Sequence, residues 1–78
     1  MLKIQPYKIN DFYEFFGQDA EIVAKALSLY LTKRIQQGKP DLPMCGFPYM
    51  RKAEFQKTLA SKDIELLEAI EGFPKKQR

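Results

Sequence analysis

The sequence predicts an all-α fold, a small bundle of three to four helices around a central helix at residues 19–37. The main observation is the run from Asp19 to Gly38, which contains no proline and no internal glycine. At 100° per residue, one stripe of this run carries Ala20, Val23, Ala24, Leu27, Leu31 and Ile35. Ile22 and Leu29 lie outside that stripe. A helix that is apolar over most of its circumference is usually covered by neighbours on several sides.

A second observation is that the segment before this run has the signals of a short helix. Within residues 10–16, Asp11 can serve as an N-cap, and Glu14 follows at the spacing of a capping box. Gly17 then provides a left-handed stop. We therefore expect a short aromatic helix that packs on the central one.

The third observation is an amphipathic pattern near the C-terminus. Residues 51–61 place Phe55 and Leu59 inward, and residues 62–71 have an apolar arc that ends at Ile70. These residues predict either two helices with a bend near Ser61 or one long helix, and the pattern leaves both open.

Two segments of the chain are predicted to be non-helical. Leu2 and Ile4 alternate around Lys3, which predicts a short extended segment at the N-terminus, without a pairing partner inside so short a chain. Residues 38–49 form a Pro-rich loop, because three prolines within it prevent a continuous helix. The loop is also rich in large apolar side chains, so it either covers the core or presents them to a partner.

Length and composition set the outer limits of the prediction. Seventy-eight residues allow a single domain, 1–78, and we expect residues 74–78 to form a frayed tail. A single cysteine cannot form an internal disulfide, and the lack of histidine argues against a zinc site. No signal peptide or membrane span is apparent, which predicts a cytoplasmic protein with no membrane partner.

The sequence offers little for catalysis. The commonest general base, histidine, is absent, and the four glycines are too scattered for a phosphate-binding loop. Cys45 lies among apolar residues and is expected to be a buried, unreactive thiol. The spacing of Glu65, Glu68 and Glu71 is that of an ordinary solvated helix face. We therefore expect a protein that is not an enzyme, with no catalytic residue, metal, cofactor or small-molecule substrate.

The chain has more large aromatic residues than a small core can hide, which favours a protein–protein interaction role. The predicted function is that of a small non-enzymatic regulator or inhibitor that occludes a partner's surface, as some mobile-element accessory proteins do. The partner is either another protein or a second copy of the chain. The predicted partner-binding residues are Met44, Phe47, Tyr49, Arg51 and Lys52.

Two alternative functions remain open. Residues 20–40 carry a net charge of +3 and residues 41–62 a net charge of +2, which allows a nucleic-acid-binding accessory protein with a basic patch around residues 38–57. Its candidate contacts are Lys33, Arg34, Lys39, Arg51, Lys52 and Lys57. The other alternative is a structural homo-oligomer subunit.

Overall fold

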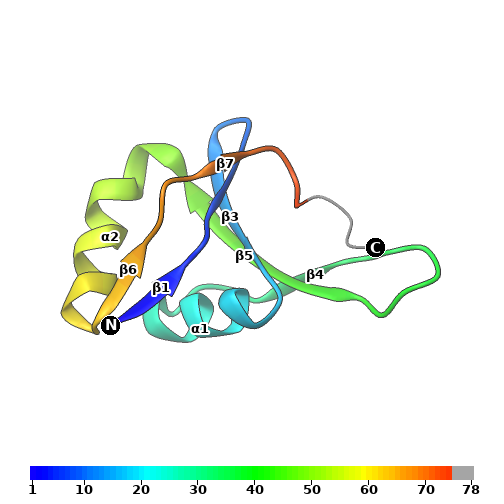
Figure 1. The fold of residues 1–78 in the computed structure, drawn as a ribbon, viewed down its shortest axis with the longest axis horizontal. Helices are drawn as coiled ribbons and strands as arrows, with labels where there is room; N and C mark the ends of the chain where they lie inside the picture. Colours follow the sequence, from blue (N-terminus) through cyan, green and yellow to red (C-terminus); the bar gives the residue numbers. More distant parts are fainter. Residues whose placement is uncertain (75–78) are drawn as a thin grey trace.

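The computed structural model describes residues 1–74, and over these residues the fold is mixed α/β, with seven strands and two α-helices (Figure 1). The elements in chain order are β1 (Leu2–Ile4), β2 (Tyr7–Ile9), β3 (Phe12–Phe16), α1 (Gln18–Leu27), β4 (Thr32–Arg34), β5 (Leu42–Pro48), the 3₁₀ turn η1 (Tyr49–Arg51), α2 (Lys52–Ser61), β6 (Ile64–Leu66) and β7 (Ile70–Glu71). The predicted all-α bundle is therefore wrong. Within residues 1–74, neither helix has the length and apolar character needed to cross a membrane.

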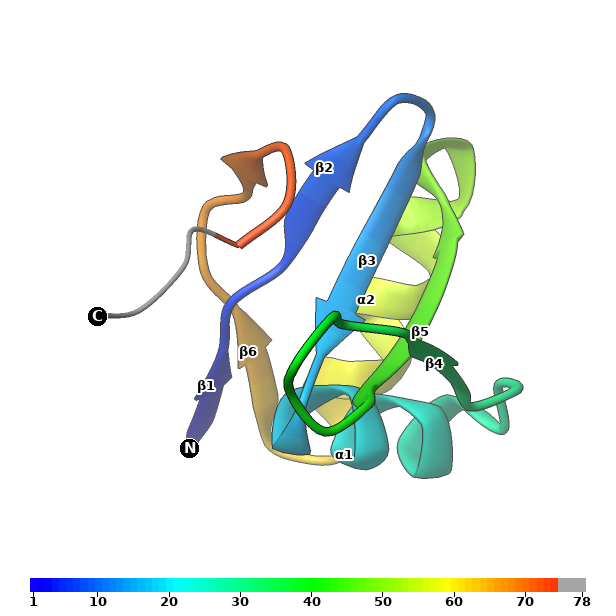
Figure 2. The same ribbon diagram turned by 90° about the vertical axis from the view of Figure 1, so that its right-hand side faces the viewer.

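The strands form two sheets. The larger has the order β4-β5-β3-β2-β7, in which all neighbours are antiparallel except the parallel pair of β2 and β7. The smaller sheet is the parallel pair of β1 and β6. As a result, the first and last parts of the described chain run side by side in the same direction, as Figure 2 shows for β1 and β6.

The larger sheet has one face covered by helices. Tyr13 and Phe15 of β3 point to this face, as do Cys45 and Phe47 of β5, and all four are buried. Figure 2 shows α2 behind β3 and β5, with α1 crossing the lower end of the same strands. The buried core combines these side chains with apolar residues of the helices and the small sheet: Ile4, Ala20, Val23, Ala24, Leu59, Ile64 and Leu66.

The opposite side of the larger sheet, which we call the open face, carries no helix. Its side chains come from alternate positions on three neighbouring strands: Tyr7 and Ile9 on β2, Phe12, Glu14 and Phe16 on β3, and Leu42, Met44, Gly46 and Pro48 on β5. Most of these residues are apolar, so the sheet has a largely apolar surface without a helical cover. This face is the part of the fold that positions the candidate site.

Residues 10–16, predicted as a helix, instead form the turn before β3 and β3 itself. The aromatic run Phe-Tyr-Glu-Phe-Phe has too many large side chains for one face of a short helix. In a strand, these side chains are divided between two faces, and aromatic residues favour strands for that reason. Gly17 does have a positive φ, of 68°, but it stands before α1 and not at the end of a helix.

The predicted central helix, 19–37, is also too long. The observed α1 ends at Leu27, because Ser28 adopts a left-handed conformation, and the Leu29 N–H then closes the helix end with a 2.9 Å hydrogen bond to the Ala24 carbonyl. The chain then turns into β4, which pairs with β5. Ile22 and Leu29 are partly buried against the core. Leu31 and Ile35, which the predicted helix placed on its apolar stripe, lie beyond α1 and are exposed.

The Pro-rich segment 38–49, predicted as a loop, contains β5, a strand with neighbours on both sides. Its two prolines, Pro43 and Pro48, lie near the two ends of the strand and not in its middle, where the missing N–H would interrupt the ladder. The N-terminal segment is extended as predicted, but it pairs with β6 inside the same chain.

The C-terminal part shows one helix followed by strands. The expected amphipathic helix at 51–61 corresponds to α2, Lys52–Ser61. The helix predicted for 62–71 is wrong, because Asp63 takes a left-handed conformation and the chain continues as β6 and β7. Ile64 and Leu66 are buried while Glu65 is exposed, which is the alternation of a strand. The predicted tail at 74–78 lies outside the described residues except for Pro74.

Candidate functional site

The turn between β2 and β3 places an aromatic side chain at one end of the open face. Asn10 has a φ of 54°, a left-handed conformation that asparagine tolerates in turns. The Tyr49 N–H donates a 2.7 Å hydrogen bond to the Asp11 carbonyl, which ties the end of β5 to this turn. Phe12 follows directly and is 43% exposed, although it is a large apolar residue. The backbone therefore holds Phe12 firmly while its ring stays accessible to solvent.

Glu14 lies two residues beyond Phe12, on the same face of β3. Its register partner on β5 is Gly46, and its carboxylate occupies the space that a side chain at Gly46 would need. Partial burial raises the pKa of the Glu14 carboxyl. Among the open-face positions of β2, β3 and β5, Glu14 is the only ionisable carboxyl. An exposed aromatic ring and a carboxyl with a raised pKa therefore share one face.

The other end of the open face is covered by aromatic contacts. The ring centroids of Tyr7 and Phe16 lie 5.6 Å apart, and those of Phe16 and Phe73 lie 6.0 Å apart. The Arg34 guanidinium of β4 lies 3.9 Å from the Phe73 ring centroid. The segment after β7 thus packs across this part of the sheet. Tyr7, Phe16 and Phe73 therefore contact other aromatic side chains of the same chain, unlike Phe12.

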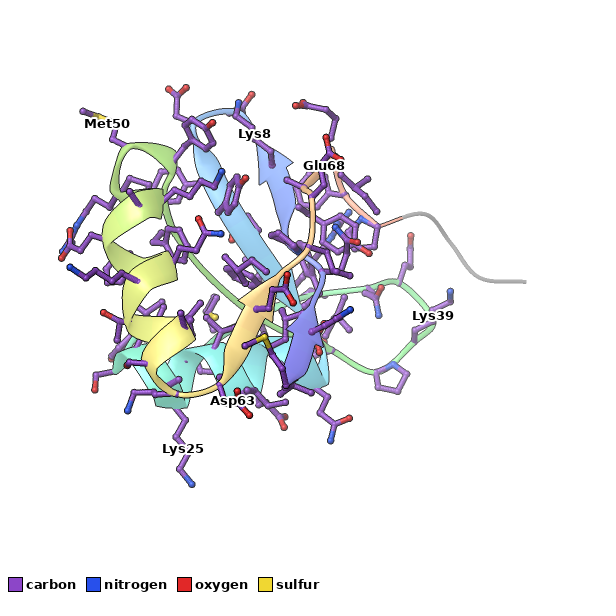
Figure 3. The ribbon with its side chains drawn as sticks, turned by 60° about the vertical axis from the view of Figure 1, so that its left-hand side comes forward. Lys8, Lys25, Lys39, Met50, Asp63 and Glu68 are labelled. Atoms are coloured by element: carbon purple, nitrogen blue, oxygen red, sulfur yellow. The ribbon has the colours of Figure 1, made fainter. Side chains whose placement is uncertain are left out.

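On the helix-covered side of the same hairpin, two lysines contact an aromatic pair. The Tyr13 and Tyr49 ring centroids are 5.3 Å apart. The Lys8 Nζ lies 5.1 Å from the Tyr49 centroid, and the Lys52 Nζ lies 5.9 Å from it. We call Lys8, Tyr13, Tyr49 and Lys52 the lysine–tyrosine cluster. Figure 3 shows Lys8 at the hairpin end together with Met50, whereas Lys25 projects from the opposite end.

The residues predicted to bind a protein partner do not form one exposed surface. Phe47 is only 1% exposed and belongs to the core, as in the interpretation that this segment covers the core. Met44 is half-buried on the open face, and Tyr49 is 42% exposed. Arg51 pairs with Glu54 at 2.7 Å, and Lys52 belongs to the lysine–tyrosine cluster.

The predicted nucleic-acid contacts are divided between two regions. Lys33, Arg34 and Lys39 lie on or beyond β4, and Figure 3 shows Lys39 at the far end of the β4–β5 hairpin. The other three are on η1 or α2: Arg51, Lys52 and Lys57. Lys33 is paired with Asp41 at 3.2 Å, so its charge is partly compensated. The structure therefore does not gather these six residues into one basic patch.

Sequence reasoning missed Lys8, Phe12 and Glu14 as candidate site residues. Phe12 and Glu14 were assigned to a helix, where they would not share a face. The signal that could have found them is the alternation within Phe12–Phe16, because residues i and i+2 of a strand point the same way.

The same stretch is part of a match to known proteins. Residues 3–77 match the family described as MutS domain I. The chain belongs to the MutS domain I family.

Within residues 1–74, no group of three or more potential metal-binding side chains is present.

Individual relatives of this MutS domain I chain are DNA mismatch repair proteins MutS. The protein of Bradyrhizobium sp. (strain ORS 278) is 42% identical over 60 residues, which cover 77% of the chain and 7% of that protein. The protein of Rhodopseudomonas palustris (strain BisB18) is 49% identical over 49 residues, or 63% of the chain and 5% of that protein. The protein of Rickettsia canadensis (strain McKiel) is 49% identical over 43 residues, or 55% of the chain and 5% of that protein. The chain thus spans less than a tenth of the length of these relatives.

Membership of the MutS domain I family corrects the predicted function. The expectation of a small inhibitor or regulator that occludes a partner's surface is wrong. It came from exclusion, because the chain lacks catalytic signatures and carries surplus aromatic residues. Those aromatic residues are largely explained by the sheet, which has one face packed under helices and the other partly lined by aromatic rings.

Proposed function

We propose that this chain acts in DNA mismatch repair as a DNA-contacting domain, in which Phe12 is inserted beside a mispaired base. The observation that carries the proposal is the pair formed by Phe12 and Glu14 on the open face of β3. The names of the relatives support the substrate class, since each is a DNA mismatch repair protein.

The geometry of the hairpin suits insertion of an aromatic side chain. Proteins that bind the minor groove frequently insert apolar side chains between base steps, and aromatic stacking on a base contributes about 1–3 kcal/mol. Phe12 stands at the start of β3, beside the β2–β3 turn, and its backbone is held by the neighbouring Tyr49–Asp11 hydrogen bond. A mispaired base is less firmly held in the duplex than a paired one, so it is easier to unstack. This difference would favour insertion at a mispair.

Glu14 would supply the second contact. An ionised carboxylate is repelled by DNA phosphates, but a protonated carboxyl can donate a hydrogen bond to an acceptor on a base edge. Burial already raises the pKa of Glu14, and the negative potential of bound DNA would raise it further. A mispair leaves base-edge groups without their usual partners, and such groups gain most from a new hydrogen bond.

The role proposed for the chain is binding and not catalysis. It would be exercised where DNA is present, which accords with the predicted cytoplasmic location. Self-association remains a separate prediction, because the Phe12–Glu14 face would act on DNA without a second copy.

The experiment that tests the proposal is a fluorescence-anisotropy titration of labelled duplexes at low salt. One duplex is fully paired and the other is identical except for a single mispair. We expect the chain to bind both, with higher affinity for the mispaired duplex. Phe12→Ala should remove the preference and leave general binding in place.

A matched control is Tyr30→Ala, because Tyr30 is an aromatic residue that is 94% exposed and distant in sequence from the β2–β3 hairpin. This variant should keep the preference for the mispaired duplex. The proposed function would be overturned if the wild-type chain bound neither duplex, or bound both equally well.

A further inference from the structure

We propose that Lys8 and Lys52, held beside the Tyr49 ring, form a binding site for a backbone phosphate of DNA next to the base that Phe12 contacts. This inference rests on the proposed function and assigns the part of the site that holds the DNA backbone. Phosphate contacts fix the position of a protein on a duplex, whereas base contacts carry the sequence information.

The lysine–tyrosine cluster brings the two ammonium groups to one aromatic ring from different elements. Lys8 comes from β2 and Lys52 from the first turn of α2. Their Nζ atoms lie 5.1 Å and 5.9 Å from the Tyr49 ring centroid, and the Lys52 Nζ is also 5.7 Å from the Tyr13 centroid. Each distance is within the range of a cation–π contact, which orients an ammonium group without neutralising its charge.

The charge of both lysines is available to a ligand. Among residues 1–74, the ion pairs formed by lysine and arginine side chains are Lys33 with Asp41 and Arg51 with Glu54, and neither Lys8 nor Lys52 takes part in one. Lys8 is adjacent to Glu71 in the β2–β7 register, but the two do not form an ion pair. Glu54, the carboxyl on the first turn of α2, is engaged by Arg51.

Lys8 also has hydrogen-bonding capacity to spare. Its Nζ donates one 3.0 Å hydrogen bond, to the Asn10 carbonyl in the β2–β3 turn. An ammonium group has three donors, so two remain for phosphate oxygens. The bond to Asn10 directs the ammonium group toward the turn that precedes Phe12.

A backbone hydrogen bond links the cluster to the residue next to Phe12. Tyr49, whose ring both lysines contact, donates its backbone N–H to the Asp11 carbonyl, and Asp11 is the neighbour of Phe12. A phosphate held by the lysines would therefore set the position of Phe12 relative to the duplex. Because phosphates are identical in every sequence, the contact should strengthen binding to paired and mispaired DNA alike.

The test is the salt dependence of duplex binding by four forms of the chain: wild type, Lys8→Gln, Lys52→Gln and the control Lys25→Gln. Lys25 is an exposed lysine of α1 at the opposite end of the molecule, so its loss changes net charge without touching the cluster (Figure 3). Each phosphate contact contributes about 0.9 to the slope of log K against log salt concentration.

We expect Lys8→Gln and Lys52→Gln each to reduce the magnitude of that slope, by up to about 0.9, on both duplexes, with the mispair preference retained. Lys25→Gln should leave the slope unchanged, and Lys8→Arg and Lys52→Arg should retain the wild-type slope. If Lys8→Gln does not fold, Lys52→Gln alone carries the test, since its side chain is on the surface of α2.

The two proposals fail in different ways. If wild type prefers mispaired DNA and Phe12→Ala abolishes that preference, but both glutamine variants keep the slope of Lys25→Gln, only the phosphate site is refuted. If wild type binds no DNA at all, the proposed function and the phosphate site are refuted together.

Discussion

The Glu14 carboxylate lies where the side chain of its register partner, Gly46, would otherwise be. An ideal Cβ at Gly46 would collide with this carboxylate and would lie 2.6 Å from the Tyr13 carbonyl oxygen. Gly46 has no positive φ, so the requirement for glycine is one of space and not of backbone conformation. The open face thus accommodates its one carboxyl through a missing side chain on the next strand.

Gly46→Ala should therefore destabilise the fold by about 1–3 kcal/mol, the range for a residue forced into a well-packed position. Urea denaturation followed by circular dichroism measures this change. Part of the collision is with the Glu14 side chain, so the same substitution in a Glu14→Ala background should cost less. Fully additive free energies of unfolding for the two substitutions would show that the carboxylate does not occupy this space.

The raised pKa of Glu14 predicts a specific pH dependence of stability. Burial disfavours the ionised form, so the folded-state pKa lies above the unfolded-state value. The favourable contribution of protonated Glu14 is fully present below the unfolded-state pKa and is lost as the pH rises through the folded-state pKa. Glu14→Gln has no carboxyl to ionise and so lacks this loss. Its free energy of unfolding relative to wild type should therefore increase as the pH rises from the unfolded-state pKa through the folded-state pKa, and then level off. Urea melts between pH 3 and pH 8 would detect this, and a pH-independent difference would contradict it.

Cys45 should be unreactive in the folded chain. It is 2% exposed, its thiol lies 3.3 Å from the Ala20 carbonyl, and burial raises its pKa to about 11. Compared with an ordinary thiol of pKa about 8.5, this lowers the thiolate fraction at pH 8 by roughly two-hundredfold. A thiol reagent should react slowly with the native chain and rapidly in urea. Equal rates under the two conditions would mean that Cys45 is accessible.

Phe47 and Tyr49 should respond very differently to truncation. Phe47 is in the core, where Phe→Ala substitutions destabilise by about 3–5 kcal/mol, and it packs on Phe55 with ring centroids 4.7 Å apart. Tyr49 is partly exposed and contacts chiefly Tyr13 and two lysines, so its truncation should cost about 1 kcal/mol. Thermal melts of the two variants compare these effects directly. Similar decreases in the stability of the two variants would contradict the burial of Phe47 and the partial exposure of Tyr49.

Local signals in the sequence were sufficient for some elements. The amphipathic spacing of Phe55 and Leu59 located α2, and the start of α1 followed from the apolar pattern after Asp19. The buried state of Cys45 was also predicted and is confirmed. These features depend on neighbours in the sequence, which a periodicity argument can evaluate.

The sheet could not be found in the same way because its pairs are distant in the chain. β1 is paired with β6, about 60 residues away, and β2 with β7. Without knowledge of those partners, the apolar residues of 62–71 were assigned to a helical arc that ends at Ile70, because short apolar runs are ambiguous by periodicity alone. The candidate site was missed for the same reason, since Phe12 and Glu14 share a face only in a strand.

The most direct test of the central claim is the fluorescence of a 2-aminopurine base placed in the mispair of a short duplex. Insertion of Phe12 should unstack this base from its neighbours, so saturating amounts of wild-type chain should raise its fluorescence. Phe12→Ala at saturation should leave the signal near that of free duplex, whereas Tyr30→Ala should match wild type. An equal rise with Phe12→Ala and wild type would contradict the assignment of Phe12 as the inserted residue.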